Sequence, residues 1–339
     1  MCEDRQGRLW LGTTRGLLRF REQEGRFENV SDITRLGEEC VHAICEDRQG
    51  DLWIGVADGG LRRLDRAWTT YTGADGLASE RGTSLAEWEG HVFAATTGGL
   101  SRLRTGASEP DRWHLAVDGD VRALRPSRQG LLCVWRNEPS LLGPDGSPLL
   151  TNLLAKMETS FHHEKTDLLE DGAGRVWVSS YGDGRAVWNG VSVEHHTTVQ
   201  GLSSDLVTCL ALGREQEIWM GTAEKGVMRY DGAYRSHRTR DGLASDYVTA
   251  LAFDHLRGCL WVGTRGGLSR FDGQRWRSWR RSEGSEGLPT DEIRTAMVDR
   301  RGRVWIGTDG GGVAIYDPKL NVFQTLSWRD GLRHNTVNA

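Results

Sequence analysis

An aspartate and a tryptophan recur together along the chain in segments of the form D-x-x-G-x-L-W. Examples are DRQGDLW at 47–53 and DRRGRVW at 299–305. Two carboxylates at a suitable separation can hydrolyse a glycosidic bond, and an aromatic ring can stack on a sugar. Each tryptophan lies in an apolar run such as LWIGV (52–56), which is typical of a buried strand. We therefore predict that these side chains pack between sheets: Trp10, Trp53, Trp177, Trp219, Trp261 and Trp305.

Two histidine clusters and one basic aromatic segment are the other candidates for chemistry. Residues 162–164 read HHE, and His195 is followed by His196. Consecutive side chains on a strand point to opposite faces, so we do not expect either cluster to bind a metal ion. The segment RWRSWRR (275–281) interleaves Trp with Arg, as single-strand binders do, but outer strands also carry arginine stems over aromatic rings. Catalytic motifs with a defined spacing do not occur. We predict no catalytic residue, no metal site and no cofactor.

The composition names no partner. The 339 residues include 43 Lys and Arg against 47 Asp and Glu, with no long run of one sign, so we predict no nucleic-acid partner. No stretch approaches the roughly 18 apolar residues of a membrane helix, and we predict no membrane insertion by this chain. The first residues, MCEDRQGRLW, lack the apolar run of a signal peptide. The six cysteines include no CxxC pair, and we expect most of them to be reduced.

The tryptophans mark a repeat that runs from one end of the chain to the other. Fourteen Trp and 44 Gly against seven Pro favour many short strands joined by tight turns. A period in the forties with several strands per unit is typical of a β-propeller, in which each unit is a four-stranded blade. We predict a single all-β domain over residues 1–339 with eight four-stranded blades. The eight landmarks are 40 to 44 residues apart: Trp10, Trp53, Phe93, Cys133, Trp177, Trp219, Trp261 and Trp305.

The unit that begins at Val41 shows how one blade is built. Residues 41–47 alternate as a first strand, and the polar turn RQG leads into LWIGV (52–56), the second strand. The glycines of ADGG (57–60) can adopt positive φ in a hairpin that leads to the third strand. Residues 68–71 then form a fourth, outer strand. A D-G-L turn follows here and in later units, and we expect its leucine to lie between blades.

Residues 105–165 are the irregular part of the chain. Five of the seven prolines fall there, and Cys133 takes the place of the landmark tryptophan. GPDGSP (143–148) predicts a turn or bulged loop, and a helical turn is an option within 149–161. The alternative to eight blades is therefore seven blades with this segment as an insertion.

The two ends of the chain complete one repeat. Residues 337–339 (VNA) followed by residues 1–4 (MCED) reproduce the template VHAICED at 41–47. We predict that the ring is closed by terminal segments that share one blade, so that no sheet edge is left unpaired.

The full unit, V-x-A-I-x-E-D-x-x-G-x-L-W-I-G-T-x-x-G-G-L-x-R-Y-D, resembles the repeat of the two-component regulator propeller family. The resemblance covers all eight units and is clearest at 41–65 and 293–317. It implies the sensor ectodomain of a bacterial hybrid histidine kinase or a related signalling protein, and a periplasmic or other extracytoplasmic location. The family's propellers commonly have seven blades, and its kinase, DNA-binding and C-terminal immunoglobulin-like domains are absent from this chain.

The direction of the strands predicts where a ligand binds. In a propeller blade, the turn between the second and third strands and the inter-blade turn emerge on the same face. Convergent polar groups over a concavity are the usual form of a binding site. The second-to-third turns differ most between units and carry mixed charge. The candidate ligand-binding residues are Arg15, Asp58, Tyr181, Asp183, Lys225, Arg265 and Asp309.

Three functions follow from this reading. We favour a non-catalytic sensor that binds a polar small molecule or an oligosaccharide. The alternatives are a protein-interaction scaffold, since fold alone does not fix function, and a propeller lyase or glycoside hydrolase.

Overall fold

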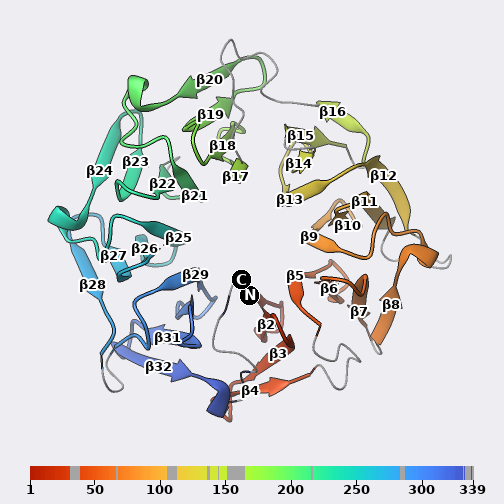
Figure 1. Cartoon of the computed structure of the whole chain (residues 1–339), viewed down its shortest axis with the longest axis horizontal. Helices are drawn as coiled ribbons and strands as arrows, with labels where there is room; N and C mark the ends of the chain where they lie inside the picture. Colours follow the sequence, from red (N-terminus) through yellow and green to blue (C-terminus); the bar gives the residue numbers. More distant parts are fainter. Residues whose placement is uncertain are drawn as a thin grey trace. The chain divides into compact units, whose positions relative to one another are not determined.

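The computed structural model describes residues 1–30, 39–65, 68–104, 113–135, 138–143, 145–150, 165–214, 217–282 and 287–330, with Leu332 and Val337. The chain divides into two compact units, Met1–Ala155 with Ala339 and Lys156–Asn338, and each is described by itself. Each unit contains four antiparallel sheets of four strands, which pair in chain order (Figure 1).

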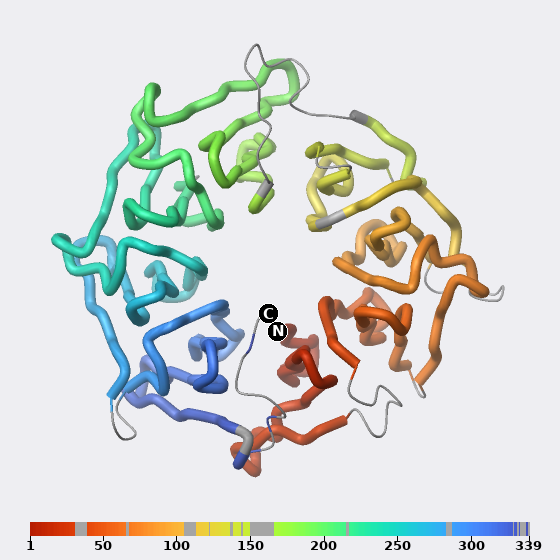
Figure 2. The backbone as a smooth tube through the Cα atoms, viewed as in Figure 1, coloured from red at the N-terminus to blue at the C-terminus, as the bar shows by residue number. Residues whose placement is uncertain are grey.

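The first unit holds the sheets that we call blades 1 to 4. Figure 2 follows their backbone from red to yellow. Their strands are β1 (Cys2–Glu3), β2 (Leu9–Thr13), β3 (Gly16–Arg21) and β4 (Arg26–Asn29); β5 (Val41–Glu46), β6 (Leu52–Val56), β7 (Leu61–Leu64) and β8 (Trp68–Tyr71); β9 (Gly82–Trp88), β10 (His91–Thr96), β11 (Gly99–Arg104) and β12 (His114–Asp118); and β13 (Val121–Pro126), β14 (Leu131–Trp135), β15 (Glu138–Leu142) and β16 (Pro148–Leu150).

The second unit holds blades 5 to 8. Its strands are β17 (Lys165–Glu170), β18 (Val176–Ser180), β19 (Arg185–Trp188) and β20 (Val193–His196); β21 (Val207–Leu212), β22 (Ile218–Thr222), β23 (Val227–Tyr230) and β24 (Tyr234–His237); β25 (Val248–Asp254), β26 (Cys259–Thr264), β27 (Gly267–Phe271) and β28 (Trp276–Trp279); and β29 (Ile293–Val298), β30 (Val304–Thr308), β31 (Val313–Asp317) and β32 (Val322–Leu326). Four short 3-10 turns precede inter-blade connections: η1 (Gly73–Asp75) in the first unit, and η2 (Thr198–Gln200), η3 (Thr239–Asp241) and η4 (Trp328–Asp330) in the second.

These sheets are the eight blades of an all-β propeller, which confirms the predicted fold class. Each of the eight landmarks lies in the second strand of its sheet. The irregular segment contributes a complete blade, β13 to β16, so the seven-bladed alternative is wrong. The predicted turn at 143–148 is present, with the amide of Gly143 bonded to the carbonyl of Ser147 at 2.8 Å. Leu149 and Leu150 belong to strand β16, and 151–161 lie outside the described residues.

The core lies between neighbouring sheets, where the second-strand tryptophans are buried as predicted. Trp219 of blade 6, for example, packs with Leu260, Val262 and Phe271 of blade 7. The first strands of neighbouring blades are also tied together. The Thr208 hydroxyl donates to the carbonyl of Val248 at 3.0 Å. Equivalent bonds run from Thr83 to Val121, from Thr166 to Val207 and from Thr249 to Ile293.

The inter-blade turns place a leucine in the core, as the D-G-L pattern predicts. The buried leucines are Leu77, Leu202, Leu243, Leu288 and Leu332. The hairpin of blade 2 depends on Gly60, which has a φ of +72°. A Cβ atom there would lie 2.1 Å from the carbonyl oxygen of Tyr71, so only glycine fits.

The chain ends follow the repeat as far as they are described. Val337 packs over Gly307 as Val248 packs over Gly221 and Ile293 over Gly263. Val337 therefore occupies the position of a first-strand residue. Thr336, Asn338 and Ala339 lie outside the described residues, and closure of blade 1 by this segment stays a prediction.

Candidate functional site

The recurring aspartates have a structural role. In blade 8, Asp299 Oδ1 accepts hydrogen bonds from the amides of Arg301 and Arg303, at 3.0 and 2.8 Å. Its Oδ2 accepts from Arg303 Nε at 2.7 Å and from the buried indole of Trp305 at 2.9 Å. The indole bond recurs at 2.8 Å in blades 1, 2 and 5, from Trp10 to Asp4, Trp53 to Asp47 and Trp177 to Asp171. These carboxylates hold the turn between the first and second strands.

In the second unit, the turns between second and third strands lie at the same end of the blades as the inter-blade turns, as the strand direction predicts. The amide of Arg265, in the turn between β26 and β27, donates to the carbonyl of Tyr247 at 3.1 Å. The amide of Asp309, in the next blade, donates in the same way to Glu292 at 2.9 Å. The second-to-third turns therefore lie against the inter-blade turns, and we call this end of blades 5 to 8 the loop face.

Two tyrosines and an arginine connect blades 5 and 7 on the loop face. Tyr181 follows β18 of blade 5 and is 41% exposed. A hydrogen bond with Tyr247, which precedes β25 of blade 7, raises the pKa of Tyr181 above its ordinary value. The guanidinium carbon of Arg265 lies 3.8 Å from the centroid of the Tyr247 ring, a cation–π contact. This triad passes across blade 6.

A depression of about 390 Å³ begins at Arg265. Its lining includes Glu292 and Arg294. Arg294 donates to Asp309 Oδ2 at 2.8 Å, and this hydrogen bond raises the pKa of Arg294. The depression thus offers guanidinium donors and carboxylate acceptors. The rings of Tyr181 and Tyr247 lie beside it, because Arg265 belongs to both the triad and the lining. Such a set can bind a polar ligand by hydrogen bonds and ring contacts.

The structure brings three of the seven predicted site residues into this arrangement: Tyr181, Arg265 and Asp309. Lys225 lies half-buried in the blade 6 turn, beside Glu224, which interacts electrostatically with Tyr181. Asp183 is 9% exposed, and its carboxylate accepts from the hydroxyl of Ser180 at 3.2 Å. Arg15 and Asp58 are exposed turn residues of the first unit.

Sequence reasoning missed Tyr247, Glu292 and Arg294, because it considered only the second-to-third turns. Tyr247 and Glu292 directly precede the first strands of blades 7 and 8. Arg294 stands where blades 5, 6 and 7 carry threonine. The sequence did contain a signal for these site residues, namely a large polar or aromatic residue directly beside the first Val or Ile of a repeat.

The histidine pair of blade 5 is not arranged as a metal site. His195 Nε2 lies 2.7 Å from the carbonyl of Asp183, whereas His196 Nδ1 lies 2.7 Å from the hydroxyl of Tyr234. Over the described ranges, no group of three or more metal-binding side chains occurs. Residues 162–164 lie outside those ranges. All six cysteines are free, and burial raises the pKa of Cys133 and Cys209 to about 12.

The basic aromatic segment forms the outer strand β28 of blade 7. Its Arg277 guanidinium lies 4.7 Å from the ring centroid of Trp279, which is buried. The arginine and tryptophan side chains of this segment thus contact each other, with an arginine covering an aromatic ring, as on other outer strands. Among the described residues, no helix is long and apolar enough to cross a membrane.

The comparison with protein-family models finds the family that the repeat resembles. The model of the family described as "Two component regulator propeller" matches residues 1–15, 35–58 and 287–310. This match confirms the resemblance seen in the repeats. No curated protein sequence matches the chain.

Solved structures with similar folds include propellers of different kinds. Saccharomyces cerevisiae Sqt1 has 12% identity and a TM-score of 0.61, with coverage of 88% of this chain and 87% of that one. Virginiamycin B lyase from Staphylococcus aureus has 10% identity and a TM-score of 0.56, with coverage of 79% and 91%. At these identities the likeness shows the fold alone.

The extracellular domain of a hybrid two component system from B. thetaiotaomicron also matches, with 18% identity and a TM-score of 0.48. The match covers 98% of this chain and 54% of that chain. The chain thus spans about half the length of that ectodomain.

Proposed function

Starting from its two component regulator propeller repeats, we propose that this chain is the ligand-binding propeller of a sensor protein. The ligand is a polar small molecule or an oligosaccharide, held on the loop face of the second unit. The observation that carries the proposal is the arrangement of Tyr181, Tyr247 and Arg265 beside the depression lined by Glu292 and Arg294.

The side chains of this site suit binding better than turnover. Asp309 is engaged by Arg294, and Tyr247 contacts both Tyr181 and Arg265. A hydroxyl-rich ligand can exchange hydrogen bonds with these groups and lay an apolar face on the tyrosine rings. Because the groups already contact one another, little side-chain freedom is lost when a ligand binds.

A thermal-shift screen with oligosaccharides and small polar metabolites tests this proposal. A ligand that binds the folded chain raises the melting temperature by mass action. We expect Tyr181→Phe and Arg265→Ala to weaken or abolish the response to a hit. Arg235→Ala, which changes an exposed residue of the outer strand β24, is the matched control.

The same experiment separates the alternatives. A hit whose affinity is unchanged in Arg265→Ala places the binding site elsewhere. Chemical conversion of a hit by the intact chain favours the lyase or glycoside hydrolase. A chain that binds none of these compounds but captures a protein through the loop face favours the scaffold.

A further inference from the structure

Blade 6 lacks the aspartate that holds the first turn of blades 1, 2, 5 and 8. The indole of Trp219 should meet a carboxylate six residues before it, as Trp305 meets Asp299. That position is Gly213. A Cβ atom at Gly213 would lie 2.8 Å from Trp219 Nε1 and 2.8 Å from Glu217 Oε2, so the indole nitrogen and the Glu217 carboxylate both border the position of the missing aspartate.

Two buried donors are left without an acceptor in the part of blade 6 that the structure describes. Trp219 is 2% exposed, and its Nε1 has no hydrogen-bond partner. The same holds for Nε of Arg229. In blade 2, Arg63 occupies the equivalent position and donates from Nε to Asp51 at 3.0 Å. Glu217 occupies the position that Asp51 has in blade 2, but Glu217 pairs with Nη2 of Arg229 and does not accept from its Nε.

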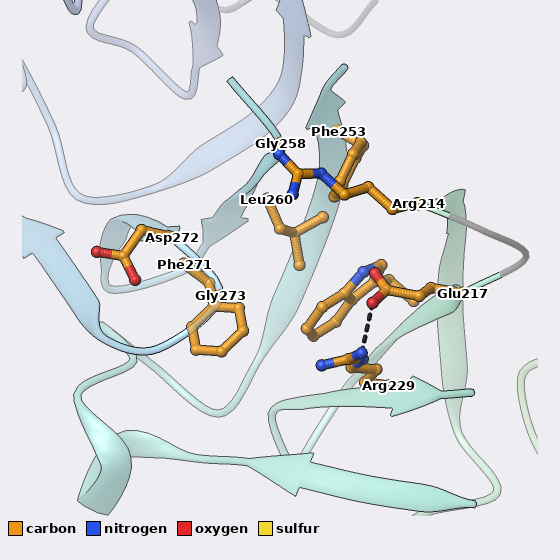
Figure 3. A pocket seen from close by; sticks show the side chains of 10 residues that line it. Arg214, Glu217, Arg229, Phe253, Gly258, Leu260, Phe271, Asp272 and Gly273 are labelled. Atoms are coloured by element: carbon orange, nitrogen blue, oxygen red, sulfur yellow. Dashed lines mark ion pairs between the residues drawn. The ribbon is translucent and has the colours of Figure 1, made fainter. Parts of the chain in front are cut away.

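A cavity opens beside these donors, between blades 6 and 7, at the opposite end of the sheets from the loop face. Its volume is about 230 Å³. Phe253, Leu260 and Phe271 supply apolar lining (Figure 3). A buried unpaired donor is unfavourable, and a ligand acceptor in this cavity relieves that penalty.

Two guanidinium groups and two carboxylates line the cavity, and one of the cations, Arg214, is not in an ion pair with a described acid. Glu217 is paired with Arg229. Asp272 accepts the amides of Gln274 and Arg275, at 2.9 and 2.8 Å. The guanidinium of Arg214 donates to the carbonyl of Arg257 at 3.3 Å and has no carboxylate partner among the described residues. Arg214 is therefore the guanidinium of the lining that can pair directly with a bound anion.

We propose that this cavity binds a small carboxylate with a short apolar chain. The ligand carboxylate lies in the cavity beside Trp219 and accepts from its Nε1, with Arg214 as the neighbouring cation. Its carbon chain lies against Phe253, Leu260 and Phe271. The site is separate from the proposed loop-face site, and neither depends on the other.

Indole N–H signals in ¹⁵N NMR spectra test this proposal directly. Acetate and propionate are titrated at constant ionic strength, with acetamide as the uncharged analogue of acetate. Trp219→Phe assigns the Trp219 signal. We expect acetate and propionate to shift the Trp219 signal in a saturable way. The Trp305 signal should not move, because the Trp305 indole already donates to Asp299. A Trp219 signal that does not move, that moves equally with acetamide, or that moves no more than Trp305 overturns the proposal.

Two variants give an independent calorimetric readout. Trp219→Phe keeps an aromatic ring but removes the donor, and Arg214→Ala removes the neighbouring cation. We expect each to weaken propionate binding by at least about tenfold, the effect of losing a charge-assisted hydrogen bond. Trp305→Phe is the matched control and should bind propionate as the unmodified chain does. Unchanged affinity in both Trp219→Phe and Arg214→Ala contradicts the site, provided that each variant gives a folded spectrum.

Discussion

The indole nitrogen of Trp305 lies 2.9 Å from Oδ2 of Asp299, in a turn where both side chains are almost completely buried. The same aspartate also accepts from Arg303 Nε and from two amides. One carboxylate thus satisfies four donors and fixes the first turn of blade 8 against its second strand. This relationship explains why D-x-x-G-x-L-W recurs without serving as a catalytic motif.

We predict that Asp299→Ala lowers the free energy of unfolding by about 3 kcal/mol, because it strands a buried indole and removes a charged acceptor. Denaturant unfolding followed by fluorescence measures this change. Asp317→Ala is the matched control in the same blade, since Asp317 accepts only backbone amides in a less buried turn. Equal losses in the two variants would contradict the role assigned to the Asp299 carboxylate.

The Gly60 hairpin gives a second stability prediction. Gly60→Ala should destabilise the chain by about 2 kcal/mol, because alanine is strained at a φ of +72° and its Cβ meets the Tyr71 carbonyl. Gly73→Ala in the same blade is the control, since a Cβ there has no neighbour within 4 Å. A Gly60→Ala protein that melts with the Gly73→Ala protein would refute this reading.

The sequence predicted those features that every repeat must satisfy in the same way. Trp53 and Leu77 are buried, and so are the tryptophans and leucines at the equivalent positions of other repeats. The spacing of these residues along the sequence therefore predicts the blades and the inter-blade turns. The loop-face cluster could not be predicted to the same extent. Tyr181 and Tyr247 are 66 residues apart, and their contact depends on how blades 5 and 7 flank blade 6.

Departures from the repeat were visible in the sequence, but their consequences were not. Gly213 stands six residues before Trp219, where blades 1, 2, 5 and 8 have aspartate. In blade 7, an extra residue places Asp254 seven residues before Trp261, and that indole also lacks a partner among the described residues. Only the side-chain packing shows that the Trp219 departure adjoins a cavity.

The half-buried His196 of blade 5 predicts a pH dependence. Burial and, next, the charge of Arg185 lower the pKa of His196. Its Nδ1 accepts from Arg185 Nη2 at 3.1 Å and from the Tyr234 hydroxyl at 2.7 Å, which requires an unprotonated nitrogen. The unfolded chain therefore binds a proton at a higher pH than the folded chain does. Stability should fall as the pH drops below about 6.5, toward the folded pKa.

His196→Gln should reduce this loss of stability on acidification, measured by urea unfolding at a series of pH values. Burial also lowers the pKa of His91 and His237, so part of the pH dependence should remain. His114→Gln, at an exposed position of an outer strand, is the control. If His196→Gln and His114→Gln retain the same pH dependence, the assignment to His196 is wrong.

The Arg294–Asp309 pair separates binding from stability at the loop face. Its side chains are 44% and 31% exposed, so Arg294→Ala should change the free energy of unfolding by only about 0.5 kcal/mol. Arg235→Ala is the matched control: it breaks an exposed 2.8 Å pair with Asp231 on the outer strand of blade 6.

With a ligand from the thermal-shift screen, calorimetry should show at least about tenfold weaker binding for Arg294→Ala, because the depression loses a charged donor. The affinity of Arg235→Ala should match that of the unmodified chain. Equal affinities in the two variants would remove Arg294 from the proposed site, whereas a large loss of stability in Arg294→Ala would show that the pair supports the fold.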